Sequence, residues 1–157
     1  MRPASAASRI ADARRVPRYR ARYPEPLHYV TDLLTAAELY SVDPLLVAAV
    51  VSVETRCDAE AIGGAGEIGL MQIHPYTWRT QEYNADRLLD ATGLVWADGY
   101  QPHLNLRIGS WILSTAIQTM RGNTRHGLAL YNGYSERGLA YADKVLAQYS
   151  RAAAMVP

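Results

Sequence analysis

The sequence has one cysteine, no phenylalanine and no long apolar run, and each shortage restricts what the chain can be. Because Cys57 is alone, no intrachain disulfide can form, and cysteine usage does not indicate a cellular compartment. The longest apolar run, Leu45 to Val51, is far shorter than the roughly 18 residues typical of a membrane-spanning helix. The formal net charge is only +1, so overall charge points to no particular class of partner.

The first 24 residues differ in composition from the rest of the chain. They contain seven arginines against one acid, Asp12, and they are interrupted by three prolines. They lack the apolar stretch of an ordinary secretory signal. We expect an extended or disordered arm over residues 1–24, one domain over 25–151 and a tail over 152–157. The arm is interpreted as a solvated tail, and binding of an anionic polymer is the alternative.

Hydrophobic spacing predicts a mainly α-helical domain. Apolar residues recur at helical intervals over 26–40, 103–120, 124–131 and 138–149, and shorter helical segments are expected after Pro75 and near 86–91. No alternating strand pattern and no internal repeat is visible. Four glycines within residues 63–69 predict a loop whose backbone can approach another group closely.

The central prediction is a buried helix that ends in an acid. Asp43 is a suitable N-cap, and the proline after it suits the first helical turn. From Leu45 to Val53 the residues are apolar except for one serine, as expected for a helix buried on nearly every side. Glu54 follows, where burial and the helix dipole both disfavour the charged carboxylate. We expect a raised pKa for Glu54 and a role as general acid; a solvent-facing acid paired with Arg56 is the alternative.

Four short motifs extend the argument beyond Glu54. They are Glu54-Thr55 with Gly69-Leu70-Met71-Gln72, then Pro102-x-x-Asn105-Leu106-x-x-Gly109, then Ala129-Leu130-Tyr131-Asn132-Gly133, then Tyr141-x-x-x-Val145. In this order they resemble the catalytic domain of soluble lytic transglycosylases, a goose-type-lysozyme-like family that cleaves bacterial peptidoglycan. The resemblance covers about residues 27–149. It implies a lysozyme-like single domain with a buried central helix and a glycine-rich active-site loop.

The resemblance implies a reaction with one catalytic acid, Glu54. The histidines lack metal-ligand spacing, and we expect no metal or cofactor. Glu54 would protonate the oxygen that joins N-acetylmuramic acid to N-acetylglucosamine. It would then take the proton of the muramic acid 6-hydroxyl as that oxygen attacks, giving a 1,6-anhydro sugar without consuming water. The substrate would place the protein in the periplasm or cell envelope, with a secretion apparatus or phage particle as further partners. No nucleic-acid partner is expected.

The resemblance also implies a substrate-binding set: Gly69, Met71, Gln72, Tyr131 and Asn132. Each has a structural alternative. Gln72 could brace the loop through backbone carbonyls rather than bind a sugar amide. The Tyr131 hydroxyl is expected beside Glu54, or else satisfied by backbone. The Met71 side chain suits packing, and Asn132 suits the turn that follows it.

Some residues depart from the family pattern and leave other functions open. Gly63 stands where many members have a serine that contacts the sugar, and the residues around Tyr131 are altered. A lysozyme-type hydrolase would need a second carboxylate, for which Glu67 is the best candidate nearby. An inactive glycan-binding or structural protein is the third interpretation.

Overall fold

The computed structural model describes residues 29–74 and 99–156, and five α-helices account for most of them. The helices are α2 (Tyr29–Leu39), α3 (Pro44–Thr55), α5 (Pro102–Thr119), α6 (Thr124–Asn132) and α7 (Glu136–Ala153). Within these ranges only isolated β-bridges occur, so the prediction of a mainly α-helical fold is confirmed. The basic arm, the helical segments expected after Pro75 and near 86–91, Trp78 and Trp96 lie outside the described residues.

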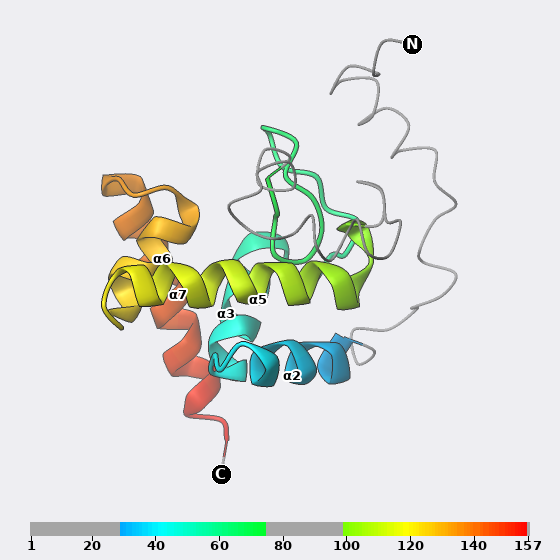
Figure 1. Cartoon of the computed structure of the whole chain (residues 1–157), viewed down its shortest axis with the longest axis horizontal. Helices are drawn as coiled ribbons and strands as arrows, with labels where there is room; N and C mark the ends of the chain where they lie inside the picture. The colour runs from blue at the N-terminus through cyan, green and yellow to red at the C-terminus, as the bar shows by residue number, and fades with distance from the viewer. Residues whose placement is uncertain (1–28, 75–98, 157) are drawn as a thin grey trace.

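Helix α3 is the centre of the core. It packs against α2 and α7, and α5 in turn packs against α2 and α6. In Figure 1 α5 runs beside α2, with α3 behind them and the loop of residues 58–74 above one end of α5. Five α3 side chains are buried: Leu46, Val47, Ala49, Val50 and Val51. Burial of this many aliphatic side chains accounts for the apolar run in the sequence.

Both ends of α3 are fixed by identifiable contacts. The Asp43 carboxylate accepts the Leu45 amide proton at 2.8 Å and also accepts the Tyr149 hydroxyl proton from α7 at 2.7 Å. At the other end Arg56 adopts a left-handed conformation, with φ 51°, and its N–H bonds the Ser52 carbonyl. The helix therefore ends one residue after Glu54, and the predicted N-cap is confirmed.

The C-terminal helix is longer than the hydrophobic spacing predicts. The spacing predicts 138–149, whereas α7 runs from Glu136 to Ala153. Its earlier start follows from Ser135, which caps the helix by accepting the Gly138 amide proton at 3.1 Å. The last two helical residues lie in the segment expected to be a tail. A polar N-cap can start a helix before its apolar stripe, and the spacing of apolar residues alone does not reveal it.

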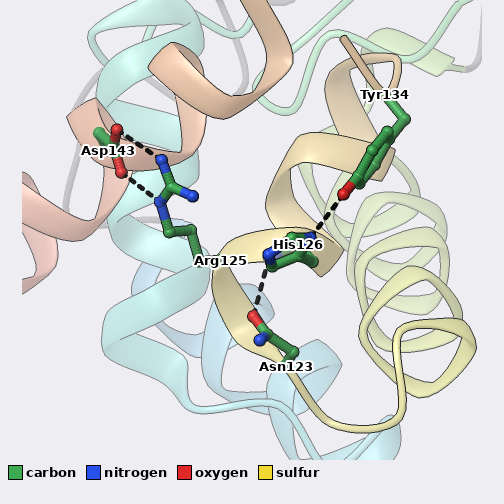
Figure 2. Close-up of polar contacts among 5 residues, drawn as sticks. All are labelled: Asn123, Arg125, His126, Tyr134 and Asp143. Atoms are coloured by element: carbon green, nitrogen blue, oxygen red, sulfur yellow. Dashed lines mark hydrogen bonds and ion pairs between the residues drawn. The ribbon is translucent and has the colours of Figure 1, made fainter. Parts of the chain in front are cut away.

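Polar contacts tie α6 to α7 across a short turn. The Arg125 guanidinium pairs with the Asp143 carboxylate at 2.7 and 3.0 Å, and the Asn123 carboxamide oxygen caps α6 by accepting the His126 amide proton at 3.0 Å. The His126 ring lies 2.6 Å from the Tyr134 hydroxyl, as Figure 2 shows. These contacts fix the turn of residues 133–135, which borders the site described next.

Candidate active site

Glu54 lies in the last turn of α3 with its carboxyl group partly buried beside α7. The Tyr141 hydroxyl of α7 donates a hydrogen bond to Glu54 Oε1 at 2.7 Å. The pKa of Glu54 is raised to about 7: burial is the main cause, the Tyr141 hydrogen bond opposes the shift, and the negative charge of Glu67 adds to it. A carboxyl group with a pKa near neutrality can both donate and accept a proton at physiological pH.

Two tyrosines lie close to this acid, with different partners. Burial and the nearby Glu54 charge raise the pKa of Tyr141 and of Tyr131, so both phenols stay protonated and act as donors. Tyr141 donates to Glu54, but the Tyr131 hydroxyl donates to the Met71 carbonyl at 2.7 Å. Tyr141 therefore orients the acid, and Tyr131 holds the glycine-rich loop.

The glycine-rich loop is folded against the end of α3 by its own backbone. Ile68 and Ile73 exchange two backbone hydrogen bonds, at 3.0 and 3.1 Å, and Gly63 N–H bonds the Glu67 carbonyl at 2.7 Å. The Thr55 hydroxyl lies 3.1 Å from the Leu70 carbonyl, which joins helix to loop. Ile68, Leu70, Met71 and Ile73 are at most 2% exposed. The loop is thus anchored in the core by apolar side chains.

One buried side chain of α5, Asn105, carries much of the loop's polar anchoring. Its carboxamide oxygen accepts the Met71 amide proton at 2.8 Å, and its nitrogen donates to the carbonyls of Ile68 and Gly99 at 2.9 and 2.8 Å. Gly109, one helical turn further along, lies so close to the Met71 side chain that a Cβ there would collide with it. The second sequence motif is therefore a support for the loop.

Two open cavities meet at Glu54. The first, of about 510 Å³, lies between the glycine-rich loop and the end of α6; its lining includes Glu54, Gly63, Gly64, Glu67, Gln72, His74, Leu130, Tyr131, Asn132 and Gly133. The second, of about 430 Å³, lies along α7; its lining is Val53, Glu54, Asn132, Arg137, Ala140, Tyr141 and Lys144. Volumes of this size can hold a sugar ring or a small ligand. Glu54 and Asn132 border both.

Comparison with known families identifies the domain. A family model described as the transglycosylase SLT domain matches residues 33–149. This chain belongs to the SLT domain family. Because that match spans α3, the loop, α5, α6 and most of α7, the whole arrangement around Glu54 lies within the SLT domain.

The chain is also similar to parts of several lytic transglycosylases. The chain is 35% identical over 71 residues to membrane-bound lytic murein transglycosylase E of Buchnera aphidicola, which is 45% of this chain and 32% of the relative. A complex of the 70-kDa soluble lytic transglycosylase with bulgecin A matches 83% of this chain and 25% of its own, with 19% identity and a TM-score of 0.70. An inactive mutant of lytic transglycosylase Slt from Pseudomonas aeruginosa matches 81% and 24%, with 18% identity and a TM-score of 0.64. The chain spans about a third or less of each relative. The structural matches show the lysozyme-like fold predicted from the motifs.

The residues expected to bind substrate do not all reach the cavities of this SLT domain. Gln72, Tyr131 and Asn132 line the first cavity, whereas Gly69 and Met71 are not in its lining. The Met71 side chain is fully buried, and Gly69, with φ 74°, lies where a Cβ would collide with Asn105. In the structure Gly69 and Met71 lie on the buried side of the loop, where they pack against α5.

Gln72 serves as a brace in the described structure. Its amide nitrogen donates to the carbonyls of Ala61 and Gly69 at 3.2 and 3.0 Å, which uses both of its donor hydrogens. Its carboxamide oxygen points to the space above Gly63, where a Cβ would lie 2.7 Å from it. Only this oxygen is left to meet a ligand.

The lack of a side chain at Gly63 has a local explanation. The Glu67 carboxylate occupies the space that a Cβ at position 63 would need, and it also accepts the Ala65 amide proton at 3.0 Å. The Glu67 carboxylate therefore fills the part of the cavity wall that a side chain at position 63 would occupy. Sequence reasoning ranked Glu67 as the best second carboxylate, and the structure places it in the same cavity as Glu54.

Tyr141 is the site residue that sequence reasoning missed. The fourth motif begins with this tyrosine, but it was not assigned to the site. A tyrosine on a C-terminal helix carries no local mark of its partner, since Glu54 is 87 residues away. Among the described residues, no group of three or more His, Cys, Asp or Glu side chains is arranged to hold a metal ion, and no helix of those ranges could cross a membrane.

Proposed function

We propose that this chain is a lytic transglycosylase that cleaves the bond between N-acetylmuramic acid and N-acetylglucosamine in peptidoglycan, with Glu54 as its acid and base. The observation that carries the proposal is the state of Glu54. It is an acid with a pKa raised to about 7, oriented by Tyr141 and placed where two cavities meet. Membership of the SLT family and the curated relative's name support the same chemistry.

The proton transfers follow from this environment. Protonated Glu54 donates to the glycosidic oxygen as the bond to the muramic acid C1 breaks, and general acid catalysis of this kind contributes roughly 10²–10⁴-fold. The Glu54 carboxylate then accepts the proton of the muramic acid 6-hydroxyl, whose oxygen attacks C1 to form the 1,6-anhydro ring. The same residue serves in both steps because its pKa lies close to neutrality.

The cavity between the loop and α6 is the proposed place for a sugar next to the scissile bond. Asn132 offers a carboxamide at the border of both cavities, and the Gln72 oxygen faces the space beside Gly63. We expect these two groups to bind the sugar's hydroxyl and acetamido groups. Tyr131, Met71 and Gly69 act indirectly, by holding the loop in place. The substrate places the reaction in the cell envelope.

The first test is mass spectrometry of purified peptidoglycan digested with the wild type and with Glu54→Gln. We expect the wild type to release muropeptides one water lighter than hydrolysis products, each ending in an anhydro-muramic residue. Glu54→Gln keeps the side-chain shape but cannot exchange the proton, so it should lose at least about 100-fold in rate. A Glu54→Gln variant with wild-type rate would refute the assignment of the acid.

A hydrolytic alternative is favoured by one observation, the presence of Glu67 in the same cavity as Glu54. An inverting glycosidase uses a second carboxylate to activate a water on the far face of the sugar. This mechanism would produce reducing-end muropeptides, and Glu67→Gln would abolish their release. If the products are anhydro sugars and Glu67→Gln still makes them, Glu67 is not a catalytic base.

A further inference from the structure

The first cavity, between the glycine-rich loop and α6, has an acidic wall. Among the described residues that line it, Glu54 and Glu67 are acids, His74 is the one basic side chain, and no lysine or arginine is present. The two acids interact, because the negative charge of Glu67 raises the pKa of Glu54. A cation in this cavity would be attracted by the negative charge of its wall, and an anion would be repelled.

Two acceptor oxygens of this wall face the same point above Gly63. A Cβ on Gly63 would collide with Glu67 Oε2 and would lie 2.7 Å from Gln72 Oε1. Both oxygens therefore border the space that a side chain at position 63 would fill. Because Gly63 and Gly64 both line the cavity and neither carries a side chain, a ligand in the cavity can reach this space.

These oxygens have few donors within the described part of the chain. Glu67 Oε2 accepts the Ala65 amide proton at 3.0 Å, but no donor there is bonded to Gln72 Oε1. The Gln72 amide is not free to turn its nitrogen towards Glu67, because that nitrogen donates to two backbone carbonyls, at 3.2 and 3.0 Å. Two acceptors that face one point repel each other unless a donor lies between them. A ligand can supply that donor.

The number of hydrogens on the ligand atom decides which group fits between the two oxygens. A sugar hydroxyl and an acetamido N–H each carry one donor hydrogen, so either group can bond only one oxygen at a time. An ammonium group has three donor hydrogens and can bond both oxygens at once. Its positive charge also strengthens the hydrogen bond to the Glu67 carboxylate. An amino sugar presents such a group, at its C2, once its acetyl group has been removed.

We propose that Glu67 and Gln72 form a subsite for an amino sugar with a free 2-ammonium group, so that this domain prefers glycan strands that have lost acetyl groups. The inference rests on the proposed function, because it assumes that a peptidoglycan strand enters the first cavity. Acetylated strands bind there through a single N–H, and N-deacetylated strands bind more tightly. Glu67 is then a specificity-determining residue and not a catalytic base.

The test is a binding measurement on Glu54→Gln, which cannot turn the ligand over. Calorimetry at pH 6, where a sugar amine carries its proton, gives the affinity for peptide-free glycan fragments of one length, with their N-acetylglucosamine either intact or N-deacetylated. We expect the deacetylated fragments to bind about tenfold tighter, as a charge-assisted hydrogen bond allows. Adding Glu67→Gln removes the charge and offers an amide donor to Gln72, so the ratio should fall close to one.

Two further variants, each in the Glu54→Gln background, separate this subsite from general attraction to an acidic surface. Glu38→Gln removes an exposed acid that lines neither cavity, so it should keep the ratio. Gly63→Ala keeps the Glu67 charge but places a methyl group in the space that the two oxygens border, so it should reduce the ratio towards one. Circular dichroism establishes that each variant is folded.

Four results would overturn the proposal. They are equal binding of acetylated and deacetylated fragments to Glu54→Gln, binding of neither, a loss of the ratio in Glu38→Gln as large as that in Glu67→Gln, and an unchanged ratio in Gly63→Ala.

Cleavage by the wild type separates this proposal from the function on which it rests. Anhydro products from acetylated strands, together with a binding ratio of one, would leave the transglycosylase intact and refute the amino-sugar subsite. If the wild type releases no product but Glu54→Gln shows the ratio and Glu67→Gln abolishes it, the subsite stands and the catalytic proposal fails.

Discussion

Three effects set the protonation of Glu54, and they act in different directions. Burial is the largest and raises the pKa, the hydrogen bond from Tyr141 lowers it, and the charge of Glu67 raises it. Tyr131, although close enough for its own pKa to be raised by the Glu54 charge, directs its hydroxyl to the loop. A general acid needs its proton at the working pH, so under the proposed function we expect these neighbours to set the pH at which activity is lost.

We expect Tyr141→Phe and Glu67→Gln to move the pKa of Glu54 in opposite directions. Removing the Tyr141 hydroxyl takes away a donor that stabilises the carboxylate, so the pKa should rise. Removing the Glu67 charge relieves repulsion, so the pKa should fall. The measurement is an NMR titration of the Glu54 carboxyl carbon, followed by the pH dependence of kcat/KM.

The alkaline limb of the rate profile should follow the titration in each variant. Tyr149→Phe is the control for Tyr141→Phe, because its hydroxyl contacts Asp43 at the other end of α3. If both site variants shift the pKa in the same direction, the assigned contributions of Tyr141 and Glu67 are wrong.

At the scale of elements, the site is a loop held between three helices. Thr55 of α3, Asn105 of α5 and Tyr131 of α6 each bond a backbone group of the loop. The conformation of the loop therefore depends on the packing of these helices. Loss of one of the three side-chain contacts should increase hydrogen exchange in the loop more than in the helices.

Asn105→Ala should release the loop. The change removes three hydrogen bonds from a fully buried position. It leaves the Met71 amide without its partner and takes a donor from the carbonyls of Ile68 and Gly99, of which Ile68 still accepts the Ile73 amide proton. An unsatisfied buried group typically costs about 1–3 kcal/mol. We expect faster hydrogen exchange at residues 68–72, a lower midpoint of urea unfolding and a large loss of activity.

A graded variant tests which bonds of Asn105 matter. Asn105→Asp keeps an acceptor for the Met71 amide but turns an oxygen towards the carbonyls of Ile68 and Gly99, so if the donor bonds matter it should lose at least as much stability as Asn105→Ala. Unchanged exchange at 68–72 in Asn105→Ala would show that the loop is held by its apolar side chains alone.

Gly138→Ala should destabilise the contact between α6 and α7. The added methyl group would meet the carbonyl oxygens of Gly133 and Ala129, and backbone atoms cannot move aside as a flexible side chain can. Overpacking of this kind costs about 1–3 kcal/mol. The midpoint of thermal unfolding measures the effect, with Gly64→Ala as control, since a Cβ there meets nothing within 4 Å. Equal midpoints for the two variants would contradict the packing described.

Features encoded by neighbouring residues could be predicted from the sequence, and contacts between distant elements could not. Asp43, its proline and the apolar run define α3 and place Glu54 at its end, because capping and burial patterns are local. The four glycines predicted the loop. The hydrogen-bond partner of Glu54 could not be predicted. The motifs indicated Tyr131, but in the structure its hydroxyl donates to the Met71 carbonyl, and Tyr141 of α7 donates to Glu54 instead.

At the scale of the whole molecule, the acid is a cost to stability. The pKa of Glu54 is raised from 4.5 to about 7 on folding, so the folded state binds more protons than the unfolded state between these pH values. The free energy of unfolding therefore falls as pH rises through this window, and the full penalty is present above pH 7. A shift of this size corresponds to roughly 3 kcal/mol.

Glu54→Gln should accordingly be more stable than the wild type at alkaline pH. Glutamine keeps an acceptor for Tyr141 but carries no charge, so the difference in unfolding free energy should be small at pH 4.5, grow towards pH 7 and then level off at about 3 kcal/mol. Urea unfolding of both proteins at pH 4.5, 6 and 8.5 provides the comparison. A difference that does not change with pH would mean that Glu54 titrates alike in the folded and unfolded chains.

The hydrogen bond between Tyr141 and Glu54 joins residues 87 positions apart, and this separation has a consequence for the order of assembly. During synthesis the ribosome delivers α3 and its acid long before it delivers α7. Until α7 docks, the Glu54 carboxyl group lacks its hydroxyl partner, Tyr141. The arrangement around Glu54 is therefore complete only after α7 has been synthesised and has docked on α3.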